Sequence, residues 1–320
     1  MSRPRAVFFG TPAIAVPSLV GLGEIADVVA VVCQPDKPAG RGLELRPPPV
    51  KERALELGIP VHQPTKVRTQ DFAAWLASLE ADFALVIAYG RILPPAVLDA
   101  PRKGCLNLHA SILPKYRGAA PITWALEAGE TKTGVSLMQM DEGMDTGPVF
   151  SITEIAIPED MNAAGLADAL ATCAADVVRT SVLPAVRGEV TATAQDHASA
   201  TAARILEKKD GLVDFTRSAK QVHDHVRAMT PWPGAFAHLS TSGKSKIVKL
   251  LETRVAGGDA GGAPGTIVEA TKSSLLIACG QGRVQLLRGQ LEGKKALSAD
   301  ELVAGRALSV GAHLSSEPVP

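Results

Sequence analysis

The chain has 320 residues, of which 46% are hydrophobic, and its 33 basic and 33 acidic residues give a formal net charge of +0. A chain of this length can bury a large core, so we expect a soluble globular protein, with two domains favoured over one. Its four cysteines are far apart and form no Cys-x-x-Cys pair, which argues against a disulfide framework or a zinc site and favours a reducing cytoplasm.

The first 33 residues predict a βαβ unit. Residues 6–9 form a short apolar run that ends at Gly10, and apolar residues then recur at helical spacing from Ile14 to Leu22. A second apolar run over 28–33 completes the unit, which implies a parallel sheet. The turn lacks Gly-x-Gly-x-x-Gly, so a nicotinamide dehydrogenase is weakly supported, because close backbone approach to a pyrophosphate needs those glycines.

The same stretch superficially resembles a signal peptide, because residues 6–23 carry no charge and follow two arginines. However, four residues would break any apolar helix there: Gly10, Thr11, Pro12 and Pro17. We therefore expect neither export nor a membrane span.

Residues 34–49 are too rich in proline and glycine for a helix or a strand, so they predict a long loop near the carboxyl end of a strand. The loop carries Lys37, Arg41 and Arg46. Long loops inside compact domains are usually functional or disordered. The sequence leaves both a binding loop and a solvated loop open.

Strands and helices continue to alternate up to residue 189, as in an α/β domain with a mostly parallel sheet. We expect helices over 50–57, 71–79, 95–98, 122–128 and 162–186, and strands over 61–63, 83–88, 105–109, 133–140 and 149–157. Residues 190–207 are rich in threonine and alanine and lack periodicity, which predicts a linker. The expected first domain therefore spans residues 1–189.

A second domain is expected over 208–314, followed by a tail over 315–320. After a helix over 218–229, Gly- and Ser-rich turns separate short strands over 236–239, 246–251, 266–269, 274–277 and 284–287, as in a small barrel. Residues 1–203 hold 17 basic and 22 acidic residues, and residues 204–320 hold 16 and 11, so the C-terminal part carries about +5. That excess suits a polyanionic partner, and an ordinary mixed surface explains it equally well.

The stretch 104–118 carries the most informative chemistry. Within the strand over 105–109, alternate residues Asn107 and His109 point to one side, and the strand then runs into a loop. Ligands in open α/β sheets bind outside the carboxyl ends of strands. The tight loop over 141–148 adds a carboxylate, Asp145.

An amide, an imidazole and a carboxylate together suit the addition of a nucleophile to a carbonyl. Asn107 can donate to a developing oxyanion, His109 can take a proton near neutral pH, and Asp145 can hold and bias the imidazole. Ser111 lies in no Gly-x-Ser-x-Gly turn and Cys105 is interpreted as a core residue, so we expect direct transfer between two bound substrates. The alternative is a hydrogen-bonded structural histidine.

Three other side chains are assigned structural roles. His223 and His225 are two residues apart on a helix and do not share a face, so they are interpreted as surface residues rather than metal ligands. Trp232 lies between two prolines and is interpreted as a domain-packing aromatic rather than a base-stacking platform.

Motifs spread across the chain resemble those of the folate-dependent formyltransferases. They are residues 8–12, 37–42, 89–94, 107–114, 141–148 and 231–233. An Asn-x-His strand with a later Asp-x-Gly-x-Asp-Thr-Gly loop is similar to the whole family, whereas the Pro-Ala-Gly-Arg-Gly loop and the C-terminal barrel resemble its tRNA-directed branch. One small departure is Ile112, where the family more often has leucine, a volume-conserving difference.

The resemblance implies a Rossmann-like catalytic domain followed by an OB-like barrel that binds tRNA. It implies that Asn107, His109 and Asp145 are catalytic. The formyl donor would be 10-formyltetrahydrofolate, and the acceptor would be the α-amine of methionine esterified to initiator tRNA. In this interpretation Asn107 and His109 hydrogen-bond the tetrahedral oxyanion, while Asp145 favours the protonated imidazole and helps to carry away the amine proton. No metal is implied, and we expect a cytoplasmic monomer.

The resemblance also implies which residues bind each substrate. The expected donor-site residues are Arg91, Ile92, Leu93, Ser111, Ile112, Leu113, Pro114, Met138 and Asp141. Arg41 and Lys37 lie in a loop similar to the family's insertion that engages the acceptor stem. Lys208 and Lys209 are expected to contact phosphates, with solvated linker lysines as the alternative.

Two rival functions remain open at this point. A formyltransferase acting on another amine, a sugar nucleotide or a glycinamide ribotide, would need neither the Arg41 loop nor a basic barrel. A non-catalytic RNA-binding protein would keep the formyltransferase-like domain as a relic. The intact set of Asn107, His109 and Asp145 argues against that second rival.

Overall fold

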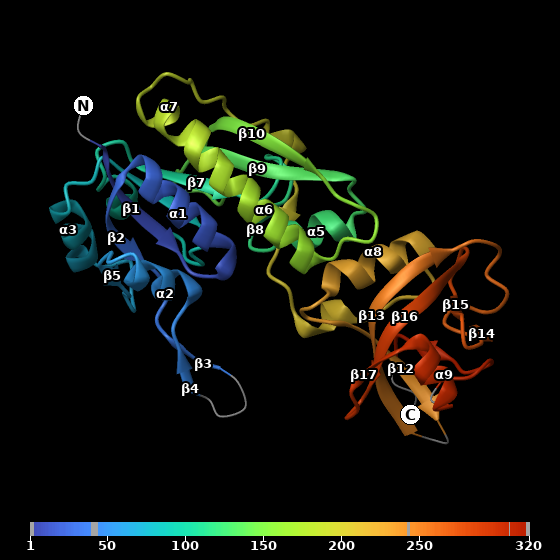
Figure 1. Ribbon diagram of the computed structural model, residues 1–320. Helices are drawn as coiled ribbons and strands as arrows, with labels where there is room; N and C mark the ends of the chain where they lie inside the picture. The colour runs from blue at the N-terminus through green and yellow to red at the C-terminus, as the bar shows by residue number, and fades with distance from the viewer. Residues whose placement is uncertain (1–2, 40–43, 242–243, 307, 318–320) are drawn as a thin grey trace. The chain divides into compact units, whose positions relative to one another are not determined.

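The computed structural model describes residues 3–39, 44–241, 244–306 and 308–317, which form two compact units (Figure 1). Unit 1 comprises Met1–Pro121, Lys132–Ala156 and Ala167–Arg204, and unit 2 comprises Ile122–Thr131, Ile157–Leu166 and Ile205–Pro320. Two short stretches of the expected first domain thus pack with the C-terminal part. The division in space is therefore not a single cut along the chain.

Unit 1 is built on a seven-stranded sheet with the order β10-β9-β7-β6-β1-β2-β5. Five strands run parallel: β1 (Arg5–Gly10), β2 (Asp27–Val32), β5 (Val61–His62), β6 (Phe83–Ile87) and β7 (Cys105–His109). β9 (Lys132–Gln139) is antiparallel to β7, and β10 (Val149–Ala156) is antiparallel to β9. β6 and β7 are buried along their whole length, because helices cover both faces of the sheet. The predicted mostly parallel sheet is confirmed.

Helices form a layer on each face of this sheet (Figure 1). α1 (Val16–Ile25) and α6 (Ala163–Val177) lie side by side on one face, where a Cβ on Gly21 would come within 3.3 Å of the Ala175 carbonyl oxygen. On the other face, α3 (Gln70–Ser78) and α4 (Pro95–Leu98) contribute Phe72 and Val97 to a core with Phe9 of β1.

The remaining helical elements of unit 1 are η1 (Ala13–Ala15), α2 (Pro49–Glu56), the π-helical η2 (Val178–Val182), α7 (Leu183–Val186) and η3 (His197–Ser199). By length and composition alone, the continuous helical run Ala163–Val186 could cross a membrane. Half of its most apolar window is buried inside the fold, and core helices of soluble proteins meet the same criteria.

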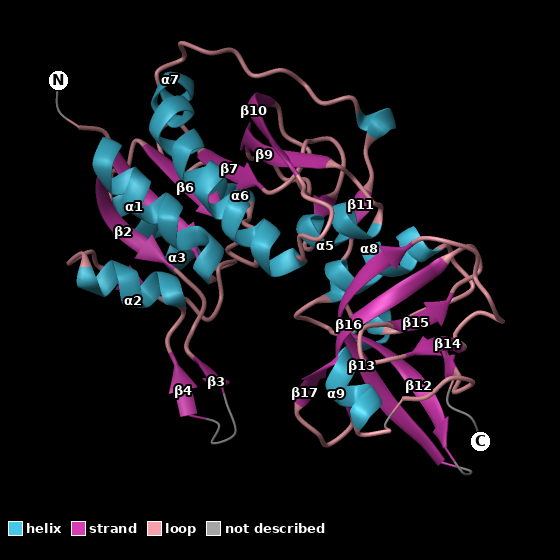
Figure 2. Ribbon diagram, turned by 45° about the vertical axis from the view of Figure 1, so that its right-hand side comes forward, coloured by secondary structure: helices cyan, strands magenta, loops and turns pink. Residues whose placement is uncertain are grey.

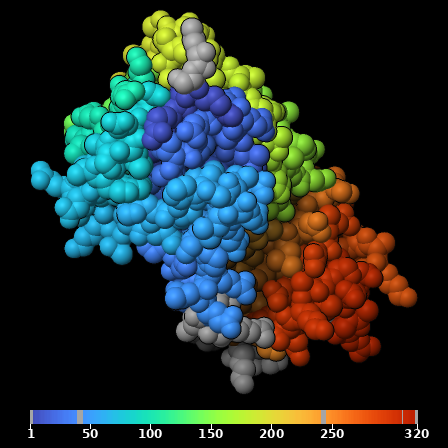
Figure 3. Space-filling model, turned by 60° about the vertical axis from the view of Figure 1, so that its left-hand side comes forward, coloured from blue at the N-terminus to red at the C-terminus, as the bar shows by residue number. Residues whose placement is uncertain are grey.

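The prediction of a strand-free loop over 34–49 is wrong in part. β3 (Lys37–Ala39) pairs with β4 (Glu44–Arg46) in a two-stranded antiparallel ribbon. Proline is tolerated at position 38 because a two-stranded ribbon has outer edges that need no N–H donor. Arg41 lies outside the described residues. The chain from β4 to α2 forms part of the surface seen in Figure 3.

A second pair of short strands was not predicted. β8 (Arg117–Gly118) pairs in parallel with β11 (Ala202–Ala203), which lies inside the expected linker (Figure 2). The segment up to Arg204 therefore belongs to unit 1. Two-residue strands have no periodicity, so no local pattern could have indicated this pairing.

Unit 2 contains a seven-stranded antiparallel sheet with the order β14-β15-β16-β13-β12-β18, and β17 pairs with β16. Its strands are β12 (Ala235–Thr241), β13 (Lys244–Ala256), β14 (Ile267–Ala270), β15 (Leu275–Ala278), β16 (Arg283–Leu291), β17 (Ala296–Ser298) and β18 (Leu314–Ser315). Register shifts between β13 and β16 let the sheet curl (Figure 2). The predicted OB-like fold is confirmed as this curled antiparallel sheet.

The helices of unit 2 include α5 (Pro121–Glu127), η4 (Lys208–Gly211), α8 (Ala219–Met229) and α9 (Ala299–Ala304). α8 buries Val222, Val226 and Met229 in the core of the curled sheet. A side chain cap from Ser218 begins this helix, because its hydroxyl accepts from the Gln221 N–H.

Two predictions about this unit are wrong. His223 and His225 are 3% and 6% exposed, so they are not surface residues. Segments distant in sequence cover their side of α8, since His223 Nε2 contacts the Glu159 carbonyl oxygen and His225 Nδ1 contacts Glu127 Oε2. Trp232, predicted to be packed, is 53% exposed.

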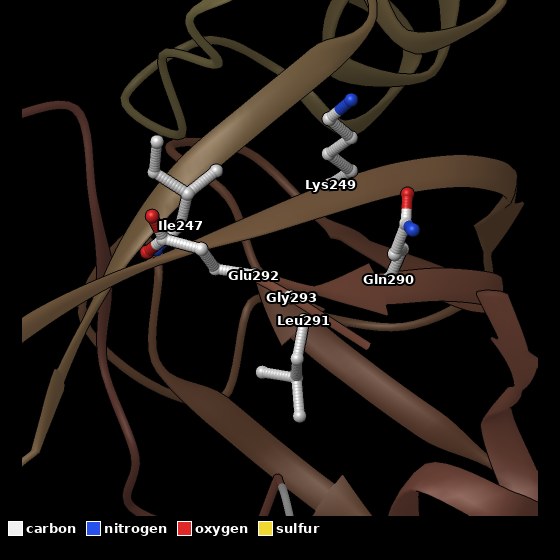
Figure 4. A pocket seen from close by; sticks show the side chains of 6 residues that line it. All are labelled: Ile247, Lys249, Gln290, Leu291, Glu292 and Gly293. Carbon is white, nitrogen blue, oxygen red and sulfur yellow. The ribbon is translucent and has the colours of Figure 1, made fainter. Parts of the chain in front are cut away.

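A shallow pocket of about 190 Å³ lies on the sheet of unit 2, between β13 and β16 (Figure 4). Its lining residues are Ile247, Lys249, Gln290, Leu291, Glu292 and Gly293. None of the site residues predicted from the sequence lies there. The pocket therefore does not mark the expected active site.

Candidate active site

The predicted amide and imidazole lie at the carboxyl end of β7 in unit 1. Asn107 and His109 are 9% and 6% exposed, and they are opposite Met138 and Ser136 of β9. Because side chains alternate along a strand, both point to the same face of the sheet. Within the described ranges, the Asn107 carboxamide makes no hydrogen bond to protein, so its N–H groups are free to bind a ligand.

The two ring nitrogens of His109 face different groups. Nε2 lies 2.9 Å from the carbonyl oxygen of Tyr116. A carbonyl oxygen only accepts, so Nε2 carries the hydrogen and Nδ1 keeps its lone pair in the neutral ring. Nδ1 lies 3.6 Å from Asp145 Oδ2, which is too far for a hydrogen bond but close enough for strong attraction once the ring is protonated.

The loop over 141–148 brings Asp145 to His109. Its backbone is left-handed, with φ of 55°, and its Oδ2 accepts from the Gly118 N–H at 2.8 Å. A Cβ at position 147 would overlap the Gln139 carbonyl oxygen, so the close return of the loop requires Gly147. The sequence-predicted residues Asn107, His109 and Asp145 thus converge on one end of the sheet.

Asp141 organises this loop through the hydrogen bonds of its own side chain. Its Oδ1 accepts from the Gly143 N–H at 3.0 Å and from the Thr146 hydroxyl at 2.7 Å. A carboxylate that accepts two bonds from groups two and five residues further along the chain stabilises a turn. Asp141 is exposed. The predicted contact of Asp141 with the formyl donor would therefore use its second carboxylate oxygen, Oδ2.

The turn over 111–114 is fixed by internal hydrogen bonds. The Ser136 hydroxyl donates to the Ser111 carbonyl oxygen at 2.7 Å and accepts from the Leu113 N–H at 3.1 Å. The Ser111 hydroxyl is fully buried and donates to the Lys115 carbonyl oxygen at 2.6 Å. Ser111 is thus committed to the turn. Leu113 is buried, and Ile112 and Pro114 are half-buried and can contact a ligand.

The predicted residues after β6 are held by a polar network. Arg91 Nε donates to Gln34 Oε1 at 3.0 Å, and its Nη1 donates to the Thr65 carbonyl oxygen at 2.6 Å. Ile92 is 52% exposed, whereas Leu93 is buried. Sequence reasoning missed Gln34, although its position two residues after the end of β2, at a carboxyl end, could have indicated it.

The predicted tRNA contacts are divided between the units. Lys37 is exposed on β3 in unit 1, and Arg41 lies outside the described residues. Lys208 and Lys209 begin η4 in unit 2, where both are exposed and Lys209 lies 2.7 Å from the Glu207 carboxylate. Ion pairs at such exposed positions are weak, so a phosphate can compete for Lys209.

Cysteine and metal chemistry are not indicated at this site. Burial raises the pKa of the Cys105 thiol to about 12 and that of Cys33 to about 11, so both are protonated and unreactive. Among the described residues, no group of three or more His, Cys, Asp or Glu side chains could hold a metal ion. Cys105 is a core residue, as predicted.

Solved structures share the fold at low identity. WlaRD, a sugar 3N-formyl transferase crystallised with dTDP and 5-N-formyl-THF, has a TM-score of 0.65 and 16% identity, covering 92% of this chain and 100% of that chain. HypX from Aquifex aeolicus, in complex with tetrahydrofolic acid, has a TM-score of 0.61 and 18% identity, covering 97% of this chain and 48% of that chain. These likenesses concern the fold alone.

Sequence relatives are much closer. Models of the formyl transferase family and of its C-terminal domain match residues 14–182 and 205–307. The methionyl-tRNA formyltransferase of Sorangium cellulosum is 61% identical over 96% of this chain and 98% of its own length. That of Myxococcus xanthus is 46% identical over 98% of both. The chain therefore belongs to the formyltransferase family, and within it to the methionyl-tRNA formyltransferases.

Proposed function

We propose that the chain transfers a formyl group from 10-formyltetrahydrofolate to the α-amine of methionyl-initiator tRNA, for translation initiation. It would work as a cytoplasmic monomer without a metal. The approach of Asp145 to His109 carries the chemical part of this proposal, together with an Asn107 carboxamide that makes no hydrogen bond to any residue that the structure describes. The 61% identity to a methionyl-tRNA formyltransferase supports the choice of acceptor.

His109 is proposed to accept the proton of the attacking amine. The Tyr116 carbonyl oxygen holds the hydrogen on Nε2, which leaves the Nδ1 lone pair available. The Asp145 carboxylate, 3.6 Å from Nδ1, then stabilises the positive ring. This geometry favours a base role for His109 over the oxyanion contact that the family resemblance suggested, because Nε2 already donates to a carbonyl group.

Asn107 is proposed to stabilise the negative charge that develops on the formyl oxygen. Its carboxamide carries two N–H donors and is nine-tenths buried, where a hydrogen bond to an oxyanion is stronger than in water. The donor supplies a formyl carbon bound to nitrogen, and the acceptor supplies a primary amine. In this addition step Asn107 would stabilise the negative charge on the formyl oxygen, and His109 would accept the proton from the positively charged amine.

The residues after β6 and β7 fit a flat, partly apolar donor. Ile92 is 52% exposed, and Met144, in the loop before Asp145, is 57% exposed, so both present apolar surface that a ring system could cover. Arg91 is held by Gln34 and Thr65 and keeps this segment in place. We propose that Ile92 and the turn over 111–114 contact the donor, and that Leu93 and Met138, which are 2% and 1% exposed, support the site from beneath.

Arg41, Lys37, Lys208 and Lys209 are proposed to contact the tRNA. Arg41→Ala should raise the KM for charged tRNA while leaving folate binding intact, because a single guanidinium contacts a phosphate or base edge and not the donor. Initial rates at varied tRNA concentration, together with folate titration, measure both effects. Equal loss of both would remove Arg41 from the acceptor site. Binding should also weaken steeply with salt.

The deciding experiment is formyl transfer by the purified chain to charged initiator tRNA and to a set of small amines. The variants His109→Ala and the exposed control His313→Ala are assayed beside the parent. Transfer to the charged tRNA that is lost only in His109→Ala supports the proposal. Transfer only to a sugar nucleotide or a ribotide amine would replace the acceptor and keep the reaction.

A further inference from the structure

The segment 193–203, predicted as part of a linker, contacts the loop that follows β7 and the loop over 141–148. We call this segment the strap. Thr193 exchanges two backbone hydrogen bonds of 2.8 Å with Val149, at the start of β10. At the other end, β11 pairs with β8, and the Tyr116 N–H donates to the Thr201 hydroxyl at 2.8 Å. Figure 2 shows the chain after α7 running as a long loop, interrupted only by the short helix η3, to β11. The strap is therefore fastened at both ends.

Gln195 is the buried polar residue of the strap, with 9% of its surface exposed. Its Nε2 donates to the carbonyl oxygens of Asp145 and Gly147, at 2.9 and 2.7 Å. Its Oε1 accepts from Nε and Nη2 of Arg117, at 3.1 and 2.6 Å. One carboxamide thus uses both of its N–H groups on the Asp145 loop and its oxygen on β8.

These contacts form a closed network of hydrogen bonds around His109 and Asp145. Arg117 stands between Tyr116, whose carbonyl oxygen faces His109, and Gly118, whose N–H donates to the Asp145 carboxylate. Gln195 ties Arg117 to the backbone of Asp145 itself. That backbone has φ of 55°, a conformation that is uncommon outside glycine and persists only when its surroundings hold it.

We infer that Gln195 is a positioning residue for formyl transfer, which sets the Asp145 carboxylate relative to His109 Nδ1 by holding the carbonyl groups of residues 145 and 147. The inference rests on the proposed roles of His109 and Asp145. Gln195 acts through the Asp145 loop and touches no reacting group, so it is not a catalytic residue. Nothing in the local sequence marks it, because it lies in a segment without periodicity.

Two variants test the NH2 group and the carbonyl oxygen of the Gln195 carboxamide. Gln195→Glu keeps the length and the acceptor for Arg117, but it sets a charged oxygen against two carbonyl oxygens. Gln195→Leu removes both groups. We expect kcat to fall on the order of 10²-fold in each, because misplacement by about 1 Å costs that much, while the KM values stay near those of the parent. Gln70→Leu, at an exposed position of α3, is the control. Full kcat in Gln195→Glu would overturn the inference.

A double-mutant cycle with Asp145→Asn tests whether Gln195 acts through Asp145. If it does, Gln195→Leu should lower kcat far less in the Asp145→Asn background than in the parent, because the carboxylate that it positions is already gone. Thermal unfolding of all four proteins identifies any variant that fails to fold, and Gln195→Glu then takes the place of the leucine variant. Effects that simply multiply would overturn the inference.

The ¹⁵N signals of the His109 ring report its surroundings without any substrate. In Gln195→Leu they should move toward their positions in Asp145→Asn, and in Gln70→Leu they should stay. Unchanged signals in Gln195→Leu would overturn the inference. A parent protein that formylates no methionyl-tRNA, while its His109 signals respond as expected, would instead remove the proposed acceptor and uphold the positioning role.

Discussion

Buried histidines occur in both units, but the fold uses their nitrogens differently. In unit 2, His223 Nδ1 lies 3.1 Å from the Thr253 hydroxyl, and its Nε2 lies 3.1 Å from the Glu159 carbonyl oxygen. In unit 1, only Nε2 of His109 is hydrogen-bonded, and Nδ1 lies 3.6 Å from the Asp145 carboxylate. Both residues are less than a tenth exposed. Burial alone therefore does not separate a structural histidine from one that is proposed to be catalytic.

The residues around each histidine show the same contrast. On α8, Asp224 is 3% exposed and lies 2.8 Å from Arg227 and 2.7 Å from Lys220. Beside His109, the buried Asn107 carboxamide has no protein partner among the described residues. An unsatisfied buried polar group costs free energy, and a ligand that binds beside it can supply the missing partner. Hydrogen-bond satisfaction distinguishes Asp224 from Asn107, although Nε2 of His225 on α8 is also buried without a partner.

Removing the site side chains gives the largest expected effect. His109→Ala and Asn107→Ala should each lower the rate of formyl transfer about 10²- to 10⁴-fold, because one removes a proton acceptor and the other an oxyanion donor. Single-turnover formylation, expressed per folded molecule, measures this loss. His223→Ala is the matched control and should keep the parent rate while losing stability. A comparable fall in rate for His223→Ala would abolish the distinction between the clusters.

Disrupting the cluster of Asp224, Arg227 and Lys220 on α8 should instead reduce the free energy of unfolding. Asp224→Ala leaves the Arg227 guanidinium, which is 6% exposed, without its carboxylate. The expected loss is roughly 3–5 kcal/mol in the free energy of unfolding, the usual result of orphaning a buried charge. Denaturant unfolding of Asp224→Ala and of the exposed control Asp168→Ala provides the comparison. A loss below about 1 kcal/mol would mean that this pair behaves as a surface ion pair.

Glu127 contacts His225 on α8 and should make the free energy of unfolding depend on pH. Burial raises the pKa of this carboxyl, but the hydrogen bonds and charges of His225 and Arg217 outweigh burial, so the pKa lies below its ordinary value of 4.5. A carboxyl with a lowered pKa stabilises the folded state above that ordinary value, and the stabilisation is lost as pH falls through the folded-state pKa. Glu127→Gln should therefore cost about 1–3 kcal/mol near neutral pH.

Unfolding of Glu127→Gln and of the parent, followed from neutral pH into the acid range, checks this sign. The difference between the two proteins should shrink below the ordinary pKa of 4.5, because the parent carboxylate then becomes protonated as well. A difference that stays constant over the whole range would show that the charge of Glu127 does not carry the effect.

Local patterns were enough for the longer strands of unit 1 and for the centre of the site, but not for the two-stranded pairs β3–β4 and β8–β11. β6 and β7 are continuous apolar runs, and the two-residue spacing of Asn107 and His109 sets them on one face. The glycines at 143 and 147 allow the tight loop that carries Asp145. These features depend on residues within a few positions of one another, which is the range that periodicity and turn chemistry cover.

Contacts between distant segments could not be predicted in this way. Gln195 reaches a carbonyl group 50 residues away, and His225 contacts a carboxylate 98 residues away. The sequence pattern of α8 marks one apolar face, but it does not reveal that residues 122–131 and 157–166 cover another. The burial of His223 and the role of the strap therefore emerge only from the tertiary structure.

Trp232 is a motif residue that neither the core nor either polar cluster uses, and it should show the smallest effect. Its side chain is 53% exposed. Trp232→Ala should change the free energy of unfolding by no more than about 0.5 kcal/mol, as exposed substitutions do. Trp75 is the matched control, because it stacks on His62 and Phe72 at ring-centroid distances of 4.0 and 5.5 Å. Trp75→Ala should cost roughly 2 kcal/mol.

Thermal and denaturant unfolding of the two tryptophan variants, with the KM for charged tRNA, decides what the exposed indole does. An exposed indole can stack on a nucleotide base, so a raised KM with unchanged stability would assign Trp232 to the tRNA surface. Equal stability losses in the two variants would show that Trp232 is packed after all. In that case the exposed fraction of Trp232 would not identify its role, just as burial alone does not identify the roles of His109 and His223.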